Sequence, residues 1–183
     1  VMADNVSDET REKLEKESSG LDIHYTSIGS SAGTFHNVFM DSLNLDDDTI
    51  VYFLENDYIH ASNSMNALFD GFDIGAHYVT LYDHPDKYIA SHDYGESTRV
   101  MKGNVCHWKM TISTTMTFAA KVSTLMEDKD IWIENTGGSY PTDHRAFTQL
   151  REKGRTLVSP IPGYSTHGET AWLSPFRNWE MII

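Results

Sequence analysis

Two acidic residues flank one asparagine in Glu55-Asn56-Asp57, directly after the apolar run from Ile50 to Leu54. Paired carboxylates at the tip of a buried strand suit a divalent cation that carries phosphates, because Mg²⁺ and Mn²⁺ prefer carboxylate and phosphate oxygens. The alternative is that Glu55 and Asp57 cap a helix that follows. The metal interpretation predicts a site for a phosphate-bearing ligand.

Two later stretches carry further polar groups that could complete such a site. Asp143 follows a glycine-rich stretch and begins a predicted helix, where a carboxylate can act as a general base or simply as an N-cap. His167 stands in the polar segment Ser165-Thr166-His167-Gly168-Glu169. A histidine there can bind a metal or be an ordinary hydrogen-bonded surface residue.

The elements that must position these residues alternate between strand-like and helix-like patterns. This order predicts an α/β fold, a mostly parallel central sheet flanked by helices, in a single domain over residues 1–183. Because open α/β sheets bind ligands at the carboxyl ends of their strands, the polar stretches are expected at one edge of the sheet. Strands are predicted at residues 1–3, 21–26, 50–54, 78–82, 105–113 and 157–160, the last at an edge of the sheet, and helices at 8–16, 34–43, 62–72, 117–125 and 141–150. Residues 92–103 are predicted to form a surface loop or hairpin, and residues 161–170 to be irregular.

Composition excludes several classes of protein. A chain of 183 residues can bury one sizeable core, and its formal net charge of −13 argues against a nucleic-acid partner. The single cysteine, Cys106, excludes an internal disulfide framework and favours a reducing compartment, so a cytoplasmic location is expected. The sequence has no apolar run long enough for a transmembrane helix. The start at Val1-Met2-Ala3 reads like the middle of a strand, which suggests a fragment of a longer chain.

Taken in order, these motifs resemble the GT-A fold glycosyltransferases, the nucleotide-sugar-dependent enzymes with an Asp-x-Asp signature. The resemblance covers most of the chain, although Glu55 replaces the first Asp of the signature and Thr142 replaces an acidic neighbour of the catalytic Asp. The matching positions are Asp4 and Asn5 after the first strand, Gly29, Gly33 and Asn37 around the next helix, Glu55-Asn56-Asp57, Asp143 and His167.

The resemblance implies transfer of a hexosyl group from a nucleotide-diphosphate sugar, expected to be a UDP-sugar, to a hydroxyl of a carbohydrate or glycoconjugate. It implies Mn²⁺ or Mg²⁺ bound by Asp57 and His167. Asp143 would be the general base, and a base on the face opposite the leaving group implies inversion at the anomeric carbon. The expected nucleotide-sugar contacts are Asp4, Asn5, Gly33, Asn37, Glu55, Asn56, Asp57 and Trp108.

Aromatic side chains are a usual platform for sugar rings, and each one here has an equally good interpretation as core packing. Trp108 is the one assigned to the nucleotide sugar, because hydroxyls from Thr111 to Thr115 follow it. The other aromatic residues near the predicted site are Tyr58, Tyr140, Tyr164 and Trp172.

Two alternative functions remain. A nucleotidyltransferase uses a similar sheet and paired carboxylates, but it should carry a basic residue in a glycine-rich loop after its first strand. The loop from Gly29 to Gly33 has no basic residue. The second alternative is a non-catalytic module that binds a nucleotide sugar without turning it over.

Overall fold

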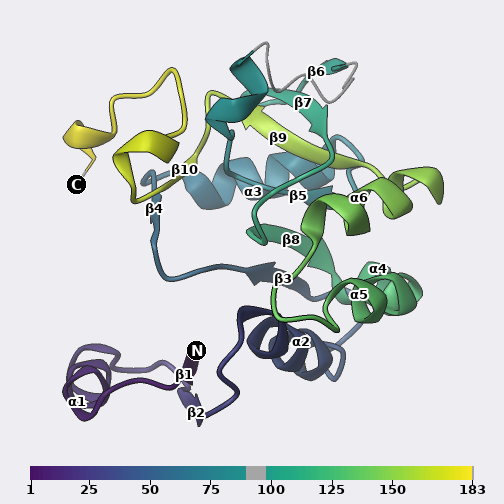
Figure 1. Cartoon of the computed structure of the whole chain (residues 1–183). Coiled ribbons are helices and arrows are strands. Elements are labelled where there is room, and N and C mark those ends of the chain that lie inside the picture. The colour runs from purple at the N-terminus through teal and green to yellow at the C-terminus, as the bar shows by residue number, and fades with distance from the viewer. Residues whose placement is uncertain (90–97, 183) are drawn as a thin grey trace.

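A mixed six-stranded sheet forms the centre of the computed structural model, which describes residues 1–89 and 98–182 (Figure 1). Within the described residues of this sheet, only β5 and β9 pair in parallel, and the four other pairings are antiparallel. The prediction of a mostly parallel sheet is therefore wrong. The strands, in spatial order, are β3 (Ile50–Phe53), β8 (Phe118–Lys121), β5 (Tyr78–Val79), β9 (Leu157–Ile161), β7 (His107–Thr111) and β6 (Val100–Lys102).

The error has a local cause in residues 117–125, which the sequence pattern predicts as one helix. The first half of that segment is instead β8, which lies antiparallel between β3 and β5, and only the second half is helical, as α4 (Val122–Glu127). The run Phe118-Ala119-Ala120 is apolar on both faces, so periodicity alone cannot separate a buried strand from a buried helix. β9 is likewise an interior strand between β5 and β7, where an edge strand was predicted.

Helices cover both faces of the main sheet, and alternate residues of its strands divide between two cores. Tyr78 and Phe118 enter one core, while their neighbours Val79 and Ala119 enter the other. The first core takes side chains from α2 (Ser31–Ser42), α4, α5 (Lys129–Asn135) and α6 (Asp143–Glu152). The second is covered by α3 (Ser64–Asp73). This two-sided burial follows from the period of two along a strand.

Stacked aromatic rings dominate the first core. The rings of Phe118 and Trp132 stack at 4.8 Å between centroids with planes 12° apart, and Phe147 meets both edge-on. Phe39 and Phe53 bring α2 and β3 to the same cluster. Rings of this size contribute most of the buried apolar area, so they fix α2, α5 and α6 against the sheet.

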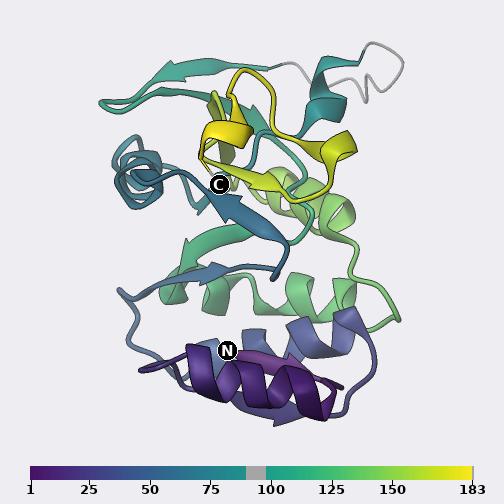
Figure 2. The ribbon, with the colours of Figure 1, turned by 90° about the vertical axis from the view of Figure 1, so that its left-hand side faces the viewer.

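The N-terminal residues form a small unit outside the main sheet. β1 (Met2–Asp4) and β2 (His24–Thr26) pair in parallel and are joined by α1 (Asp8–Glu17), which lies at the far end of the molecule in Figure 2. The predicted helix start is confirmed, because the Ser7 hydroxyl accepts a hydrogen bond from the Thr10 N–H at 3.2 Å. α1 buries no residue, in keeping with its charged sequence.

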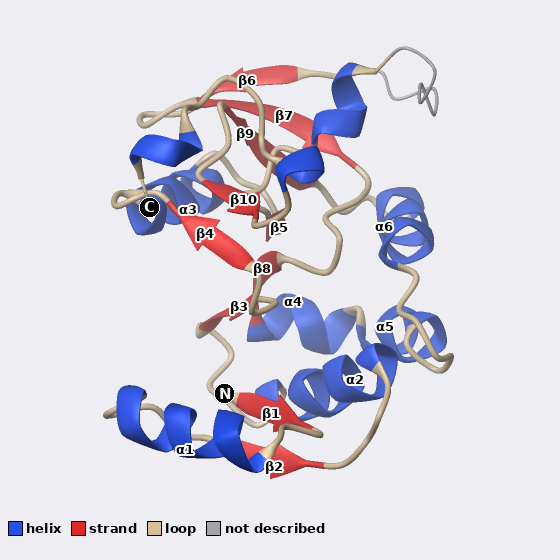
Figure 3. Ribbon diagram, turned by 60° about the vertical axis from the view of Figure 1, so that its left-hand side comes forward, coloured by secondary structure: helices blue, strands red, loops and turns tan. Residues whose placement is uncertain are grey.

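A second small sheet crosses above the end of β3. β4 (Tyr58–His60) pairs antiparallel with β10 (Ser165–His167), and Figure 3 shows the two strands side by side. Residues 165–167 are therefore a strand, although 161–170 were predicted to be irregular. Hydrophobic periodicity cannot identify a strand of three residues, because so short a segment contains less than two periods of the alternation.

In residues 1–89 and 98–182, the remaining elements are three short 3₁₀ turns, η1 (Pro85–Tyr88), η3 (Thr170–Trp172) and η4 (Trp179–Met181). Of the predicted loop or hairpin at 92–103, residues 92–97 lie outside the described residues, and residues 100–102 form β6. None of the helices in the described residues is long and apolar enough to cross a membrane. One domain over residues 1–183, within a longer chain, stays a prediction.

A buried carboxylate ties the helical face to the start of β9. Asp128 is 1% exposed and accepts hydrogen bonds from the Tyr78 hydroxyl at 2.8 Å, from Lys153 Nζ at 2.6 Å and from Arg155 Nε at 2.8 Å. Trp132 Nε1 in turn donates to the Tyr78 hydroxyl at 3.1 Å. The carboxylate is thus satisfied by three side chains, from β5 and from the turn between α6 and β9, as a buried acidic group requires.

We expect Asp128→Ala to lower the free energy of unfolding by about 3–5 kcal/mol, because it leaves two cations and a phenol without their common partner. Urea unfolding measures this as a lower midpoint. Asp130→Ala, an exposed residue in the first turn of α5, is the matched control and should cost less than about 1 kcal/mol. Equal midpoints for the two variants would contradict a structural role for Asp128.

Candidate functional site

Three strands of the main sheet end at the same edge. β3 and β5 both run antiparallel to β8, and β9 runs parallel to β5, so the carboxyl ends of β3, β5 and β9 meet where β8 begins. The turn Glu55-Asn56-Asp57 leaves β3 at this edge and leads directly into β4. The first motif therefore occupies a strand end, where an open α/β sheet offers ligands its loops.

Asp57 and His167 lie in contact, although 110 residues separate them in the sequence. The β4–β10 ladder sets His167 opposite Tyr58, and His167 Nε2 lies 3.0 Å from Asp57 Oδ2. The Gly168 N–H also donates to the Asp57 carbonyl at 2.7 Å. A Cβ at residue 168 would lie 3.0 Å from that carbonyl oxygen, so glycine is the residue that lets the two backbone segments come this close.

The hydrogen bonds of the His167 ring define its protonation pattern. Nδ1 accepts a hydrogen bond from the Glu169 N–H at 3.1 Å. The proton of the neutral ring must therefore lie on Nε2, from which it is donated to Asp57. A metal ion at Nε2 would move the ring proton to Nδ1, which could then no longer accept the hydrogen bond from the Glu169 N–H. Asp57 could therefore bind a metal with less rearrangement than His167.

The Asp143 carboxylate is fixed by the chain that leads into β8. Asp143 is the first residue of α6, and its Oδ2 accepts hydrogen bonds from the N–H groups of Thr114 and Thr115, each at 2.8 Å. Thr115 and Met116 have φ angles of 49° and 62°, in the left-handed region that non-glycine residues rarely adopt. Backbone strain of this kind clusters at ligand and catalytic sites, because surrounding contacts must hold it.

Tyr58 connects the Asp57–His167 pair to the Asp143 turn. Its hydroxyl lies 2.6 Å from Thr115 Oγ1, and its ring meets the His167 ring edge-on at 5.5 Å. Loss of hydration raises the pKa of Tyr58 to about 12, so the phenol stays neutral. The three predicted site residues Asp57, His167 and Asp143 are thus joined through one side chain and one turn.

Glu55 is exposed, and its carboxylate is close enough to Asp57, His167 and Asp143 for their charges to affect its pKa. Partial loss of hydration raises its pKa most; the negative charges of Asp57 and Asp143 raise it further, while His167 opposes them. Asn56 lies beside it in the same exposed turn. The turn is therefore a concentration of negative charge, which attracts a cation.

The donor set fits a divalent cation shared with a ligand. Within residues 1–89 and 98–182, no group of three or more His, Cys, Asp and Glu side chains is arranged to hold a metal ion by itself. Asp57 and His167 offer two donors, with side chains 49% and 20% exposed. Mg²⁺ in nucleotide sites usually takes one or two carboxylates and completes its shell with phosphate oxygens and water.

Of the predicted nucleoside contacts, Asp4 and Asn5 lie in the N-terminal unit, and Gly33 and Asn37 lie in α2. Figures 1 and 3 place the N-terminal unit beyond β3 from β4 and β10. Asp4 accepts hydrogen bonds from Thr26 Oγ1 at 2.8 Å and from the N–H groups of Ile28 and Gly29 at 2.6 and 2.8 Å. These bonds lower the pKa of Asp4, the Ile28 N–H most. Its carboxylate thus closes the loop between β2 and α2.

The other residues of that group have separate settings. Asn5 is exposed, with a φ of 50°. Gly33 packs so closely that a Cβ would lie 2.6 Å from Ile28 Cγ2. Asn37 is exposed and lines an open hollow of about 630 Å³ together with Met2 and Tyr25. Asn5 and Asn37 are exposed to a ligand, whereas Gly33 serves the packing of the first turn of α2 against Ile28.

Trp108 does not join the site at the sheet edge. It is fully buried in the second core, and its indole N–H donates to Asp70 Oδ2 at 2.9 Å. A ring with no exposed surface has no face to offer a sugar in this conformation. The core-packing interpretation accounts for its surroundings.

Residues that the sequence did not single out hold the site together. Thr114 and Thr115 act through backbone N–H groups, which leave no signal in residue type. The sequence predicts Tyr58 only as a platform for a sugar ring, and its bond to Thr115 joins residues 57 positions apart. In the sequence, the only indication of this arrangement is the hydroxyl-rich stretch from Thr111 to Thr115, which follows a predicted strand.

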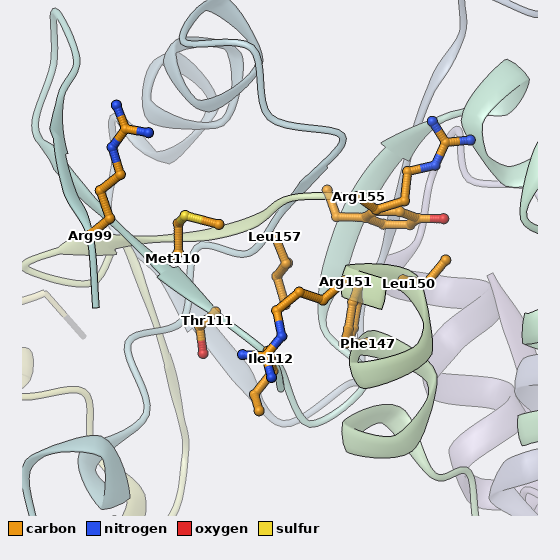
Figure 4. A pocket seen from close by; sticks show the side chains of 10 residues that line it. Arg99, Met110, Thr111, Ile112, Phe147, Leu150, Arg151, Arg155 and Leu157 are labelled. Carbon is orange, nitrogen blue, oxygen red and sulfur yellow. The ribbon is translucent and has the colours of Figure 1, made fainter. Parts of the chain in front are cut away.

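A cavity of about 200 Å³ lies away from this edge, between β7, β9 and the carboxyl-terminal half of α6 (Figure 4). Its lining combines apolar side chains such as Met110 and Phe147 with Arg99, Arg151 and Arg155. Arg155 is already bound to Asp128. None of the predicted site residues lines this cavity.

Comparison of the chain with models of known protein families gave no match, and comparison with functionally curated proteins gave none either. The functional argument therefore depends on the geometry of Asp57, His167, Asp143 and their partners.

The raised pKa of Glu55 predicts a cost in stability at neutral pH. Protonated Glu55 is favoured in the folded state, so this stability is present below the ordinary value of 4.5 and is lost as the pH rises through the raised pKa. We expect Glu55→Gln to raise the melting temperature in metal-free buffer at neutral pH by about 1–2 °C, and to have little effect below pH 4.5.

Thermal unfolding across this pH range checks the expectation. Glu12→Gln, on the exposed face of α1, is the control and should give no pH-dependent gain. A melting temperature that falls at neutral pH in Glu55→Gln would show that the charge stabilises the turn.

Proposed function

We propose that this chain is the catalytic domain of a metal-dependent glycosyltransferase of GT-A type, which transfers a hexosyl group from a UDP-sugar to a hydroxyl acceptor with inversion. The observation that carries the proposal is the convergence of Asp57, His167 and Asp143 at one edge of the sheet, linked through Tyr58 and Thr115. The order of these motifs in the sequence supports the GT-A part of it.

Asp57 and His167 would hold Mn²⁺ or Mg²⁺, together with phosphate oxygens of the donor. The cation supplies positive charge to the diphosphate as the leaving group becomes more negative. Glu55 and Asn56, exposed beside Asp57, would contact the ribose or a water on the metal. Asn5 and Asn37 are the proposed contacts to the nucleoside, with Asp4 and Gly33 holding the loop between them.

Asp143 is the proposed general base. The N–H groups of Thr114 and Thr115 stabilise the ionised carboxylate through Oδ2 and orient it, which leaves Oδ1 to accept a proton. In the transfer step, the acceptor oxygen forms a bond to the anomeric carbon and its proton passes to Oδ1. The bond from that carbon to the diphosphate oxygen breaks, and UDP leaves with the bonding electrons. A base opposite the leaving group gives inversion.

UDP with Mn²⁺ should raise the melting temperature, since a ligand at a hundredfold excess over its Kd adds about 2.7 kcal/mol to the stability of the folded state. EDTA should abolish the shift, because the diphosphate is held through the cation. Asp57→Asn should remove most of the shift, and His167→Ala should reduce it.

The same variants separate the possible failures. Asp47→Asn, an exposed acidic residue in the turn before β3, is the control and should keep the full shift. Absence of any shift with nucleotide diphosphates and either metal would overturn the metal site. A shift without turnover of any donor would indicate a binding module, and release of pyrophosphate from a nucleoside triphosphate incubated with a sugar phosphate would indicate a nucleotidyltransferase.

Asp143→Asn should keep the thermal shift with UDP and Mn²⁺ but lower the rate of sugar transfer by about 10²–10⁴, since the amide cannot accept the proton. Release of UDP from the donor in the presence of acceptor measures the rate. Glu152→Gln, at the other end of α6, should behave like the native protein. Normal turnover of Asp143→Asn would exclude Asp143 as the base.

A further inference from the structure

The cavity of about 200 Å³ between β7, β9 and α6 lies over a row of side chains to which three neighbouring strands contribute (Figure 4). Tyr78 on β5 pairs with Leu157 on β9, and Leu157 pairs with Thr111 on β7. Paired residues of neighbouring strands point to the same face of a sheet, which here is the face of the first core. The cavity is therefore an opening at the margin of that core.

One face of α6 gives the cavity an apolar wall and a positive charge. Phe147, Leu150 and Arg151 are three and four positions apart, and residues at this spacing are neighbours on a helix surface. Phe147 and Leu150 are at most 2% exposed, whereas Arg151 is exposed. In Figure 4 the Arg151 side chain extends from α6 toward Thr111 and Ile112, which line the cavity from the end of β7. The cavity thus has a guanidinium group at an otherwise apolar border.

The charge of the lining is opposite to that of the chain as a whole. Asp and Glu outnumber Lys and Arg by 27 to 14, and only six residues of the chain are arginines. Three of these six, Arg99, Arg151 and Arg155, line the cavity, and no acidic residue does so in the part of the chain that the structure describes. A positively charged hollow in an acidic protein favours an anionic ligand.

Two of the three arginines have no partner within the described residues. Arg155 is bound to Asp128, so its charge is already neutralised. Within residues 1–89 and 98–182, the guanidinium groups of Arg99 and Arg151 make no hydrogen bond or ion pair, and the Thr111 hydroxyl makes no hydrogen bond. Structural cations of this chain are paired with carboxylates, whereas these donors at the cavity are free to bind a ligand.

We propose that this cavity is a binding site for a small organic anion, in which one carboxylate or phosphate is attached to an apolar body of about one ring. The acid group accepts hydrogen bonds from Arg151 and from the Thr111 hydroxyl, and Arg99 adds positive charge at the mouth. The apolar body packs on Phe147 and Leu157. An apolar cavity of about 150 Å³ holds benzene, so about 200 Å³ accommodates a body of that size.

This site is separate from the sheet edge that carries Asp57, His167 and Asp143, because none of these residues lines the cavity. The inference therefore does not depend on the proposed function. The methyl groups of Met110, Leu150 and Leu157 lie at the cavity, so their nuclear magnetic resonance signals report on it without donor, acceptor or metal.

Benzoate and phenyl phosphate are the probes, since each joins one acid group to one ring. Acetate and inorganic phosphate carry the charge without the ring, and benzyl alcohol carries the ring without the charge. We expect at least one of the two ring anions to shift the three methyl signals in a saturable manner, with a Kd at least about tenfold below those of the other three compounds. The tighter of the two ring anions shows whether the site prefers a carboxylate or a phosphate.

Substitutions test the role of the charge. Arg151→Gln should raise the Kd of the tighter ring anion about three- to tenfold, because it removes a charge-assisted hydrogen bond. Arg99→Gln should raise it about twofold, because Arg99 contributes charge from an exposed position. Arg145→Gln is the matched control, since Arg145 is also an exposed arginine of α6 but is bound to Glu134 and lies outside the cavity lining. It should leave the Kd unchanged.

Two results would overturn the inference. In the first, neither ring anion binds at the three methyl groups more tightly than acetate, inorganic phosphate and benzyl alcohol. In the second, Arg151→Gln and Arg145→Gln weaken binding equally, which would show attraction to the general surface charge. Failure of the proposed function is a separate outcome, since it appears as loss of the thermal shift with UDP and Mn²⁺.

Discussion

The short antiparallel pairing of β4 with β10 is the constraint on which the candidate site depends. It joins two segments that are more than a hundred residues apart and sets His167 opposite Tyr58, beside Asp57. Strands of three residues contribute few hydrogen bonds of their own. Further contacts stabilise the pairing: the Gly168 N–H donates to the Asp57 carbonyl, and Tyr82 forms a β-bridge with Ser165. Because these contacts are packed on the two buried cores, the geometry of the site depends on the whole sheet.

The acidic residues of this chain divide into two groups by what surrounds them. Asp70 and Asp128 are buried, and Asp4 is bonded to a closing loop; each accepts several donors and stabilises the backbone around it. Glu55 and Asp57 are exposed and close together at a strand end, where the charge of Asp57 adds to the raised pKa of Glu55. Structural carboxylates are satisfied from within the chain, whereas those of the turn would be satisfied by a ligand.

Strain and repulsion concentrate at the same edge. Thr115 and Met116 adopt left-handed backbone conformations, and Glu55 carries a raised pKa, while the cores behind them are aromatic and well packed. A rigid scaffold that supports an unfavourable local arrangement is typical of binding and catalytic sites.

The sequence by itself determined several of the local elements and the residue types that could do chemistry. The Ser7 cap, the helices from residues 8, 34 and 62, and the acidic turn after β3 were all predicted, because capping and periodicity are local properties. The tertiary structure alone decided the pairing order of the strands. It put β8 between β3 and β5, kept β1 and β2 out of the main sheet and buried Trp108 against Asp70. The sequence predicted Asp57, His167 and Asp143 at one edge of the sheet, but only the tertiary structure decided that they are linked through Tyr58 and Thr115, since bonds from backbone N–H groups leave no pattern in the order of residues.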